Sequence, residues 1–88
     1  MKSSALPEFW DCLEILPPQQ VQKIARKNFK LWQKNPSLKS LAFKKIKSDL
    51  WSVRAGSGFR ALATFEDGRY LWFWIGTHDE YERIIRNF

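Results

Sequence analysis

The 88-residue chain has little of the side-chain chemistry on which many enzymes depend: it contains one cysteine, Cys12, and one histidine, His78. A single cysteine cannot form an internal disulfide, and one cysteine and one histidine far apart do not make a zinc site. No Gly-rich phosphate-binding loop is present either, because the short GSG stretch at 56–58 joins two apolar segments and is typical of a turn between strands. The sequence therefore predicts neither a metal nor a cofactor.

Long hydrophobic runs are also missing. No apolar run approaches the roughly 18 residues that cross a membrane. The first ten residues, MKSSALPEFW, lack the apolar segment of a secretory signal peptide. Together with the scarcity of cysteine, these absences predict a cytoplasmic protein without a membrane partner. We expect one domain, residues 1–88, whose core depends on five Trp, seven Phe and two Tyr residues.

Acidic residues are nearly absent from the middle of the chain. Residues 23–60 contain eleven Lys or Arg and one acid, Asp49, whereas the rest of the chain contains four basic and eight acidic residues. The formal net charge of +6 therefore comes from the middle. A basic surface of this kind predicts either a polyanion or an acidic protein as partner, and charge alone leaves both open.

The first segment with a clear apolar period is helical. Residues 19–34 place apolar side chains on one arc of a helix and Lys or Arg on the opposite arc. Pro17 and Pro18 suit the opening of this helix, since proline is tolerated in the first turn. Residues 6–15 fit either a first strand or a helical turn.

After residue 35 the apolar period changes to two. This pattern predicts four strands, at 42–47, 50–55, 59–66 and 69–75. Their links are short, which favours antiparallel neighbours. Residues 79–87 predict a short terminal helix, and the sum is an α+β fold with a helical layer on one face of an antiparallel sheet.

The alternation also assigns side chains to the two faces of this sheet. The face expected to lie under the helices holds Trp51, Val53, Ala55, Phe59, Ala61, Ala63, Phe65, Leu71, Phe73 and Ile75. The other face is expected to be open and to carry Arg54, Arg60, Tyr70, Trp72 and Trp74, with His78 at its rim. Arginine binds phosphate and aromatic rings stack on unpaired bases, so such a face suits RNA. Burial of the tryptophans and surface salt bridges of the arginines are the alternatives.

Several short motifs follow one another along this part of the chain. They are a Lys-rich strand with Lys44, Lys45 and Lys47, then LWSVR, GFR, YLWFWI and IGTH. In this order and spacing the chain resembles the RelE/ParE superfamily of toxins from bacterial toxin–antitoxin systems. The similarity covers about residues 18–81.

The resemblance implies a small curved antiparallel sheet of about four strands, packed on N-terminal helices and followed by a short C-terminal helix. Many members of the superfamily are metal-independent endonucleases that cut mRNA on the ribosome and so inhibit translation. Members of the ParE branch inhibit DNA gyrase instead, and both kinds are neutralised by a cognate antitoxin. A non-catalytic member that binds RNA or protein is a further alternative.

Under the nuclease alternative, the resemblance also implies roles for single residues. The residues implied for catalysis are Arg54, Arg60, His78 and Tyr81. The residues implied for RNA binding are Lys44, Lys45, Lys47 and Trp74. Because RNA supplies its own nucleophile, the 2′-hydroxyl, the two arginines would neutralise developing charge and His78 would protonate the leaving 5′-oxygen. Tyr81 would orient the base or the histidine.

The surroundings of His78 leave two questions open. The acids Asp79, Glu80 and Glu82 either place negative charge beside the RNA or lie on the far side of the terminal helix, where the first two would favour its N-terminus. Gly76 is expected to give the backbone room to turn before His78. No residue stands out as a general base.

Overall fold

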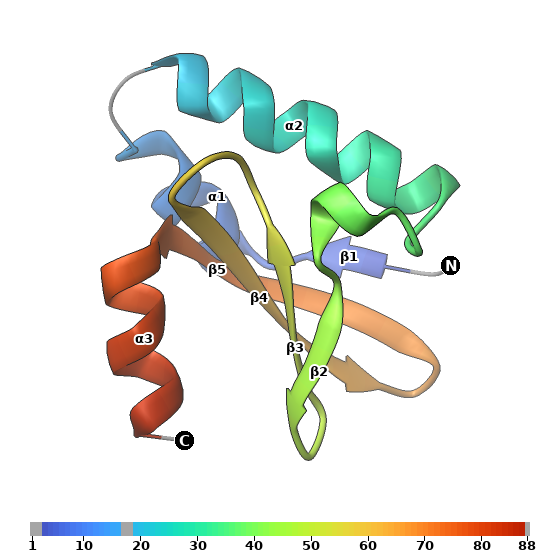
Figure 1. Cartoon of the computed structure of the whole chain (residues 1–88). Helices are drawn as coiled ribbons and strands as arrows, with labels where there is room; N and C mark the ends of the chain where they lie inside the picture. Colours follow the sequence, from blue (N-terminus) through green and yellow to red (C-terminus); the bar gives the residue numbers. More distant parts are fainter. Residues whose placement is uncertain (1–2, 17–18, 88) are drawn as a thin grey trace.

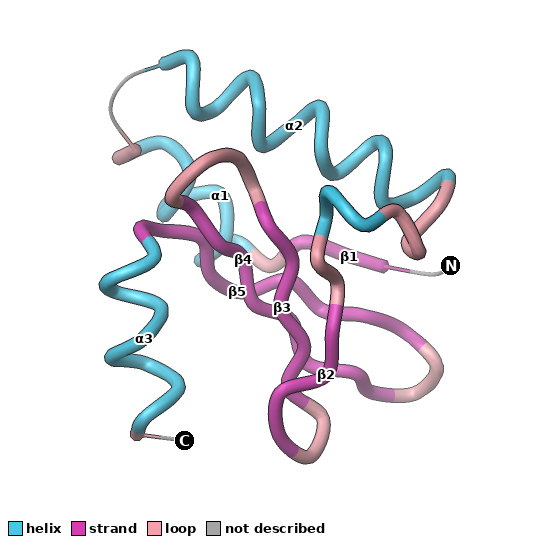
Figure 2. The backbone as a smooth tube through the Cα atoms, viewed as in Figure 1, coloured by secondary structure: helices cyan, strands magenta, loops and turns pink. Residues whose placement is uncertain are grey.

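The computed structural model describes residues 3–16 and 19–87 (Figure 1). Its elements are β1 (Ser3–Ala5), α1 (Pro7–Glu14), α2 (Gln19–Lys34), a 3-10 turn (Lys39–Leu41), β2 (Lys44–Lys47), β3 (Leu50–Arg54), β4 (Phe59–Glu66), β5 (Arg69–Thr77) and α3 (His78–Arg86). The strands form one five-stranded sheet in the order β1-β5-β4-β3-β2. Figures 1 and 2 show α1 and α2 on one side of this sheet and α3 on the other. The predicted α+β class is confirmed.

The helices follow from the sequence pattern with one addition. The predicted helix at 19–34 is confirmed as α2. The segment 6–15, which fitted either a strand or a helical turn, forms α1. Pro7 is the first residue of this helix, where the missing proline N–H leaves no hydrogen bond unmade. Pro17 and Pro18, expected to open α2, lie outside the described residues. None of the helices in the described part of the chain is long and apolar enough to cross a membrane.

The strand at the start of the chain was not predicted. β1 pairs with β5 in parallel, with Ser3 opposite Tyr70 and Ala5 opposite Trp72. The Leu6 amide extends the pairing by donating to the Trp72 carbonyl at 2.8 Å. The sheet is therefore mixed rather than purely antiparallel, and it has five strands rather than four. Three residues are too few to show the alternation of a strand, so β1 can be recognised only from its pairing with β5.

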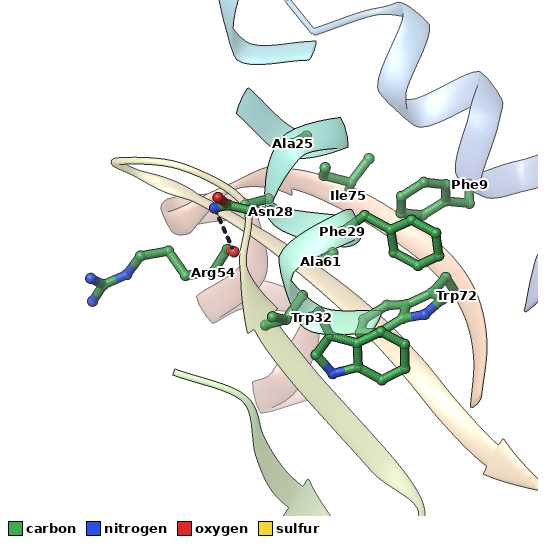
Figure 3. Close-up of a pocket in the computed structure, with 11 residues that line it drawn as sticks. Phe9, Ala25, Asn28, Phe29, Trp32, Arg54, Ala61, Trp72 and Ile75 are labelled. Carbon is green, nitrogen blue, oxygen red and sulfur yellow. Dashed lines mark hydrogen bonds between the residues drawn. The ribbon is translucent and has the colours of Figure 1, made fainter. Parts of the chain in front are cut away.

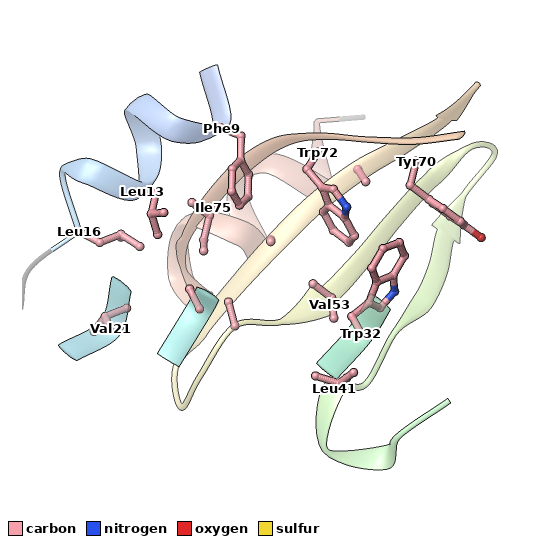
Figure 4. Close-up of a cluster of buried hydrophobic side chains, with 14 residues drawn as sticks. Phe9, Leu13, Leu16, Val21, Trp32, Leu41, Val53, Tyr70, Trp72 and Ile75 are labelled. Atoms are coloured by element: carbon pink, nitrogen blue, oxygen red, sulfur yellow. The ribbon is translucent and has the colours of Figure 1, made fainter. Parts of the chain in front are cut away.

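Six aromatic rings fill the space between α2 and the sheet. This aromatic core consists of Phe29, Trp32, Phe43, Trp51, Tyr70 and Trp72. Trp32 is fully buried, and its ring lies edge-on to Trp72 at 5.2 Å and to Tyr70 at 5.4 Å between centroids (Figure 4). Such edge-to-face pairs each contribute about 0.5–1.5 kcal/mol beyond the burial of their area. The prediction that Tyr70 and Trp72 lie on the open face is therefore wrong.

A bulge in β5 explains the error. Leu62 pairs with Trp74 while the next residue of β4, Ala63, pairs with Trp72, so Phe73 is an extra residue in the ladder. One extra residue reverses the alternation of side chains beyond it. As a result Trp72 and Trp74 lie on opposite faces, and Phe73 packs on the α3 side rather than under α2. Ile75 still reaches the α2 side, as predicted.

Leu71 is the other side chain that the strict alternation misplaced. It lies between Tyr70 and Trp72, which both face α2, so it faces the α3 side. On that side α3 packs on the sheet through Tyr81, with Leu50 and Leu62 beneath it. The second face is therefore only partly open, and the open part is the end of the sheet next to the β3–β4 turn.

Candidate functional site

An open hollow lies where β3 ends, β4 begins and α3 starts. Its volume is about 600 Å³, and its lining consists of Ser40, Arg54, Gly56, Ser57, Gly58, Phe59, Arg60 and His78. We call it the arginine hollow. Arg54 and Arg60 pair directly across the two strands, so they share one face of the sheet. Three of the four residues implied for catalysis thus meet in one place.

The β3–β4 turn holds these residues together through its backbone. Gly56 and Gly58 have φ values of +121° and +78°, which residues with a Cβ rarely adopt. The Phe59 amide donates to the Gly56 carbonyl at 3.2 Å. The Gly58 carbonyl in turn accepts the His78 amide at 2.8 Å, which ties the start of α3 to the turn. The distance between the arginines and the histidine is therefore set by regular backbone contacts.

Arg60 has an unusual environment for a charged side chain. It is half-buried, and its guanidinium carbon lies 5.6 Å from the centroid of the Tyr81 ring. Its Nη1 atom is buried and has no hydrogen-bond partner among the described residues. A buried donor without a partner destabilises a fold by about 1–3 kcal/mol, and more when it is charged. Because Nη1 is covered, an anion in the hollow would meet the exposed part of the Arg60 side chain, and Nη1 itself would become available only if the side chain moved.

Arg54 is held by its backbone and exposed at its side chain. Its carbonyl accepts a hydrogen bond from the Asn28 side-chain amide of α2 at 3.2 Å. Figure 3 shows this bond and shows the guanidinium pointing away from the buried side chains beneath α2. Arg54 therefore adds an exposed positive charge to the rim of the hollow, whereas Arg60 adds a half-buried one.

His78 is the first residue of α3, and its side chain is 46% exposed. Its Nε2 atom lies 3.5 Å from the Glu82 carboxylate, one turn along the same helix. The imidazole ring is 5.6 Å from the Tyr81 ring. The histidine therefore has an exposed ring, a neighbouring carboxylate and a place beside two arginines, which are conditions that suit proton transfer.

Tyr81 lies beneath the site rather than in it. The residue is 4% exposed, and its hydroxyl donates to the Ser52 hydroxyl at a long 3.5 Å. Ser52 is itself fully buried between the sheet and α3. A nucleobase cannot stack on a ring covered in this way. Of the two roles implied for Tyr81, the geometry favours orienting His78 over orienting the base.

Glu80 has a structural task at the start of α3. The Thr77 hydroxyl accepts the Glu80 amide at 3.2 Å, and the Glu80 carboxylate accepts the Thr77 amide at 3.1 Å, so the two form a capping box. These bonds from Thr77 hold the pKa of Glu80 below its usual value. Of the two alternatives for the acids, Asp79 and Glu80 lie in the first turn of α3, whereas Glu82 lies beside His78.

The three lysines implied for RNA binding lie on the edge strand β2, but on different faces. Lys44 pairs with Ser52 and Lys47 with Leu50, so both share the face of the arginine hollow. Lys45 pairs with Trp51 of the aromatic core and lies on the α2 side. The Lys47 ammonium donates to the Ile85 carbonyl of α3 at 2.9 Å. In register, Lys44 is the lysine nearest to the hollow.

Trp74 lines a different hollow from the arginines. It lies with Cys12, Ile15 and Thr77 between α1 and the start of α3. Its ring packs over Gly76, where an added Cβ would lie 2.4 Å from the Trp74 Cζ2 atom. The expectation that Gly76 lets the backbone turn is wrong, because Gly76 lies within β5. Its missing side chain instead makes room for Trp74.

Sequence reasoning missed two features of this site, the Gly58 carbonyl and the buried Ser52 hydroxyl. The contact of His78 with Glu82 agrees with the alternative that His78 packs locally at a helix start, since residues four apart are neighbours on a helix. Within the described residues, no three His, Cys, Asp or Glu side chains gather to hold a metal ion.

Comparison with known sequences gives no assignment: no family model and no curated protein matches the chain. Comparison with solved structures finds similar folds. The RelB–RelE antitoxin–toxin complex from Methanococcus jannaschii is similar over 91% of this chain and 95% of that one, with a TM-score of 0.69 and 16% identity. A YoeB/ParE toxin from Agrobacterium tumefaciens is similar over 89% and 99%, with a TM-score of 0.65 and 15% identity.

A third similar structure is the toxin–antitoxin complex RelBE2 from Mycobacterium tuberculosis. The similarity covers 88% of this chain and 96% of that one, with a TM-score of 0.62 and 17% identity. The structural neighbours are thus toxins of the RelE, YoeB and ParE types. The chain has the fold of these toxins, as its motifs predicted.

Proposed function

We propose that this protein is the toxin of a toxin–antitoxin pair and a metal-independent endoribonuclease that cuts mRNA on the ribosome. The observation that carries the proposal is that Arg54, Arg60 and His78 line one open hollow. Guanidinium groups beside a histidine suit cleavage of a phosphodiester, because the cations stabilise developing negative charge and the imidazole can transfer a proton. The shared fold of the RelE- and YoeB-type toxins supports the same conclusion.

The reaction follows from the chemistry of RNA. The 2′-oxygen attacks the adjacent phosphorus and loses its proton to solvent, and the bond from phosphorus to the 5′-oxygen breaks. The 5′-oxygen takes a proton from His78, and the products are a 2′,3′-cyclic phosphate and a 5′-hydroxyl. Arg60 and Arg54 stabilise the additional negative charge that the phosphoryl oxygens carry in the transition state.

The lysines and Trp74 have supporting roles in this proposal. Lys44 extends the positive charge of the hollow along the same face of the sheet, and Lys47 extends it further along β2. Trp74 lies in the neighbouring hollow, which Phe59 also lines, so a base next to the cleaved bond would stack there. Lys45, on the other face, would contact RNA outside the hollow.

An antitoxin is the proposed protein partner. Two of the similar solved structures are antitoxin–toxin complexes. An acidic segment that covers the arginine hollow would pair with Arg54 and Arg60 and keep the site from RNA. The middle of the chain, with its eleven basic residues, offers the complementary charge.

Primer extension on mRNA from cells that express the protein tests the activity. We expect cuts within translated frames, and none with Arg60→Ala at equal protein level. Intact mRNA together with accumulated gyrase–DNA cleavage complexes would instead support the ParE-like alternative. Intact mRNA without such complexes would leave the non-catalytic alternative.

A further inference from the structure

α1 and α2 enclose a second hollow between them, which we call the helix cleft. Its volume is about 340 Å³, and the side chains that line it include Phe9, Trp10, Leu13, Arg26, Phe29 and Lys30. None of its lining residues also lines the arginine hollow. Clefts of about 300–1,000 Å³ are typical of sites that bind small molecules. The helix cleft is therefore large enough for a ligand of its own.

The interior of the helix cleft is apolar. Phe9 and Leu13 of α1 are buried, and the half-buried Phe29 of α2 lines the same space. Figure 3 shows the rings of Phe9 and Phe29 near each other, each from its own helix. Trp10, which is 41% exposed, lines the cleft at the surface of the protein. These walls favour a ligand with an aromatic or aliphatic body, because its apolar surface would leave water.

Two cations of α2 lie at the mouth of the helix cleft. Arg26 and Lys30 are exposed and four residues apart, so their side chains are neighbours on the helix. The Arg26 guanidinium lies over the Trp10 ring, 5.5 Å from its centroid. A guanidinium that stacks through its face still has N–H groups to donate at its edge.

The charge of these two cations is not neutralised nearby. Neither Arg26 nor Lys30 forms an ion pair within residues 3–16 and 19–87. No acidic side chain lines the helix cleft in the same part of the chain, and α2 itself contains no acidic residue. The apolar interior and the positive mouth together complement a ligand that is apolar at one end and anionic at the other.

We propose that the helix cleft binds a small monocarboxylate with an aromatic or aliphatic body. The body lies against the apolar walls, and the carboxylate accepts hydrogen bonds from Arg26 and Lys30. This site is separate from the arginine hollow, so it does not depend on the proposed nuclease activity.

A protein segment fits the helix cleft less well than a small molecule does. The large apolar residues that are exposed in the described chain are Trp10, Ile15, Ile24 and Phe65, and only Trp10 lines the cleft. A stable protein interface buries about 800 Å² on each partner around an apolar centre. Apolar surface that is confined to one cleft instead suits a ligand that the cleft largely encloses.

NMR titration with three probes of the same shape tests the proposal. The probes are phenylbutanoate, phenylbutanol and phenylbutylamine, which differ only in the charge of the terminal group. Phenylbutanoate should bind about 10-fold more tightly than phenylbutanol, because hydrogen bonds to charged groups are stronger than neutral ones. Phenylbutylamine should bind most weakly. The indole N–H signal of the exposed Trp10 should shift far more than that of the fully buried Trp32.

A pair of substitutions tests the two cations. Arg26→Gln combined with Lys30→Gln should weaken phenylbutanoate binding about 10-fold and leave phenylbutanol binding unchanged. The matched control is Lys23→Gln combined with Lys27→Gln, which removes the same charge from the same helix at the same spacing. Its two side chains do not line the cleft, so the control should change phenylbutanoate binding by less than about twofold. Circular dichroism and urea unfolding verify that both variants are folded.

Several results would overturn the proposal. Equal affinity of the wild type for phenylbutanoate and phenylbutanol would remove the role of the anion, and equal losses in the two variants would mean that only the net charge of α2 matters. Shifts that cluster away from the helix cleft, or no binding at millimolar phenylbutanoate, would show that the cleft is not a carboxylate site. If an acidic antitoxin depends on Arg26 and Lys30 while phenylbutanoate does not bind, the cleft is a protein interface and the proposal is wrong.

Discussion

The two sides of the sheet are built from similar residue types but serve different ends. On the α2 side, the fully buried Trp32 packs with the five other rings of the aromatic core, where the indole N–H groups of Trp32 and Trp72 have no hydrogen-bond partner among the described residues. On the α3 side, the buried ring of Tyr81 supports Arg60, whose Nη1 atom is buried without a partner. Both sides thus bury a donor without a partner, but only on the α3 side does that donor belong to a charged residue that lines an open hollow.

The largest expected effect concerns the α2 side. Trp32→Ala removes a side chain that contacts four other rings and leaves a cavity in the core. Such a change should lower the free energy of unfolding by about 3–5 kcal/mol, a large share of the total for a domain of this size. Urea denaturation measures this change in the free energy of unfolding. The control is Trp10→Ala, which removes a tryptophan that is 41% exposed. A loss below 1 kcal/mol for Trp32→Ala would show that the aromatic core is not where stability resides.

The next prediction tests the opposite behaviour on the α3 side. Arg60→Ala should abolish growth inhibition and lower the cleavage rate by about 10²–10³-fold, as expected when a donor to a transition-state charge is lost. Its free energy of unfolding should stay the same or rise, because the substitution removes a buried unpaired donor. A variant that unfolds would make Arg60 a structural residue, and one as toxic as wild type would exclude it from the site.

The histidine distinguishes chemistry from binding within the hollow. His78→Gln should lower the single-turnover cleavage rate by about 10²-fold, the usual range for a positioned proton donor, with little change in RNA affinity. Arg54→Ala should weaken binding more and reduce its salt dependence by about one counterion. Cleavage of ribosome-bound mRNA by His78→Gln at the wild-type rate would leave the histidine as only the first residue of α3.

A smaller effect is expected where the two sides meet in β5. Gly76→Ala places a methyl group against the Trp74 ring and should lower the free energy of unfolding by about 1–3 kcal/mol. Adding Trp74→Leu should recover part of this loss, because the smaller side chain vacates the space. The comparison requires unfolding curves for both single variants and the double variant. No recovery in the double variant would mean that the strain lies in the backbone rather than in the contact with Trp74.

β5 also shows which parts of the fold can be predicted from the sequence alone. The periods predicted α2 and the four antiparallel strands, because each buries one face and repeats its apolar residues accordingly. They misplaced Tyr70 and Trp72, because a bulge depends on the pairing of two strands and leaves no mark in either sequence. For the same reason β1 was missed: its three residues form a strand only where β5 offers an edge.

The site was predictable to a similar degree. Arg54 and Arg60 follow from the alternation before and after a Gly-rich turn, and the structure places both beside His78. The alternation could not predict that Tyr81 is buried or that Lys45 lies on the opposite face, since these depend on the position of α3 and on the register of β2. The functional roles of these residues stay predictions that the variants above test.

The smallest expected effect is a pH dependence of the free energy of unfolding that comes from the start of α3. It tests whether an acid there stabilises the helix. Hydrogen bonds from Thr77 hold the pKa of Glu80 below its usual value of 4.5. A lowered pKa in the folded state means that the ionised form stabilises the fold above pH 4.5, and that this contribution is lost as the pH falls further. Glu80→Gln keeps an acceptor for the Thr77 amide but not the charge. At pH 7 it should therefore be less stable than wild type by a few tenths of a kcal/mol. Urea unfolding of both proteins between pH 3 and 7 should show this difference vanish at the acidic end. If the difference instead stays constant across this range, the charge of Glu80 contributes nothing to the helix start, and its place in the hollow that Trp74 lines would need another explanation.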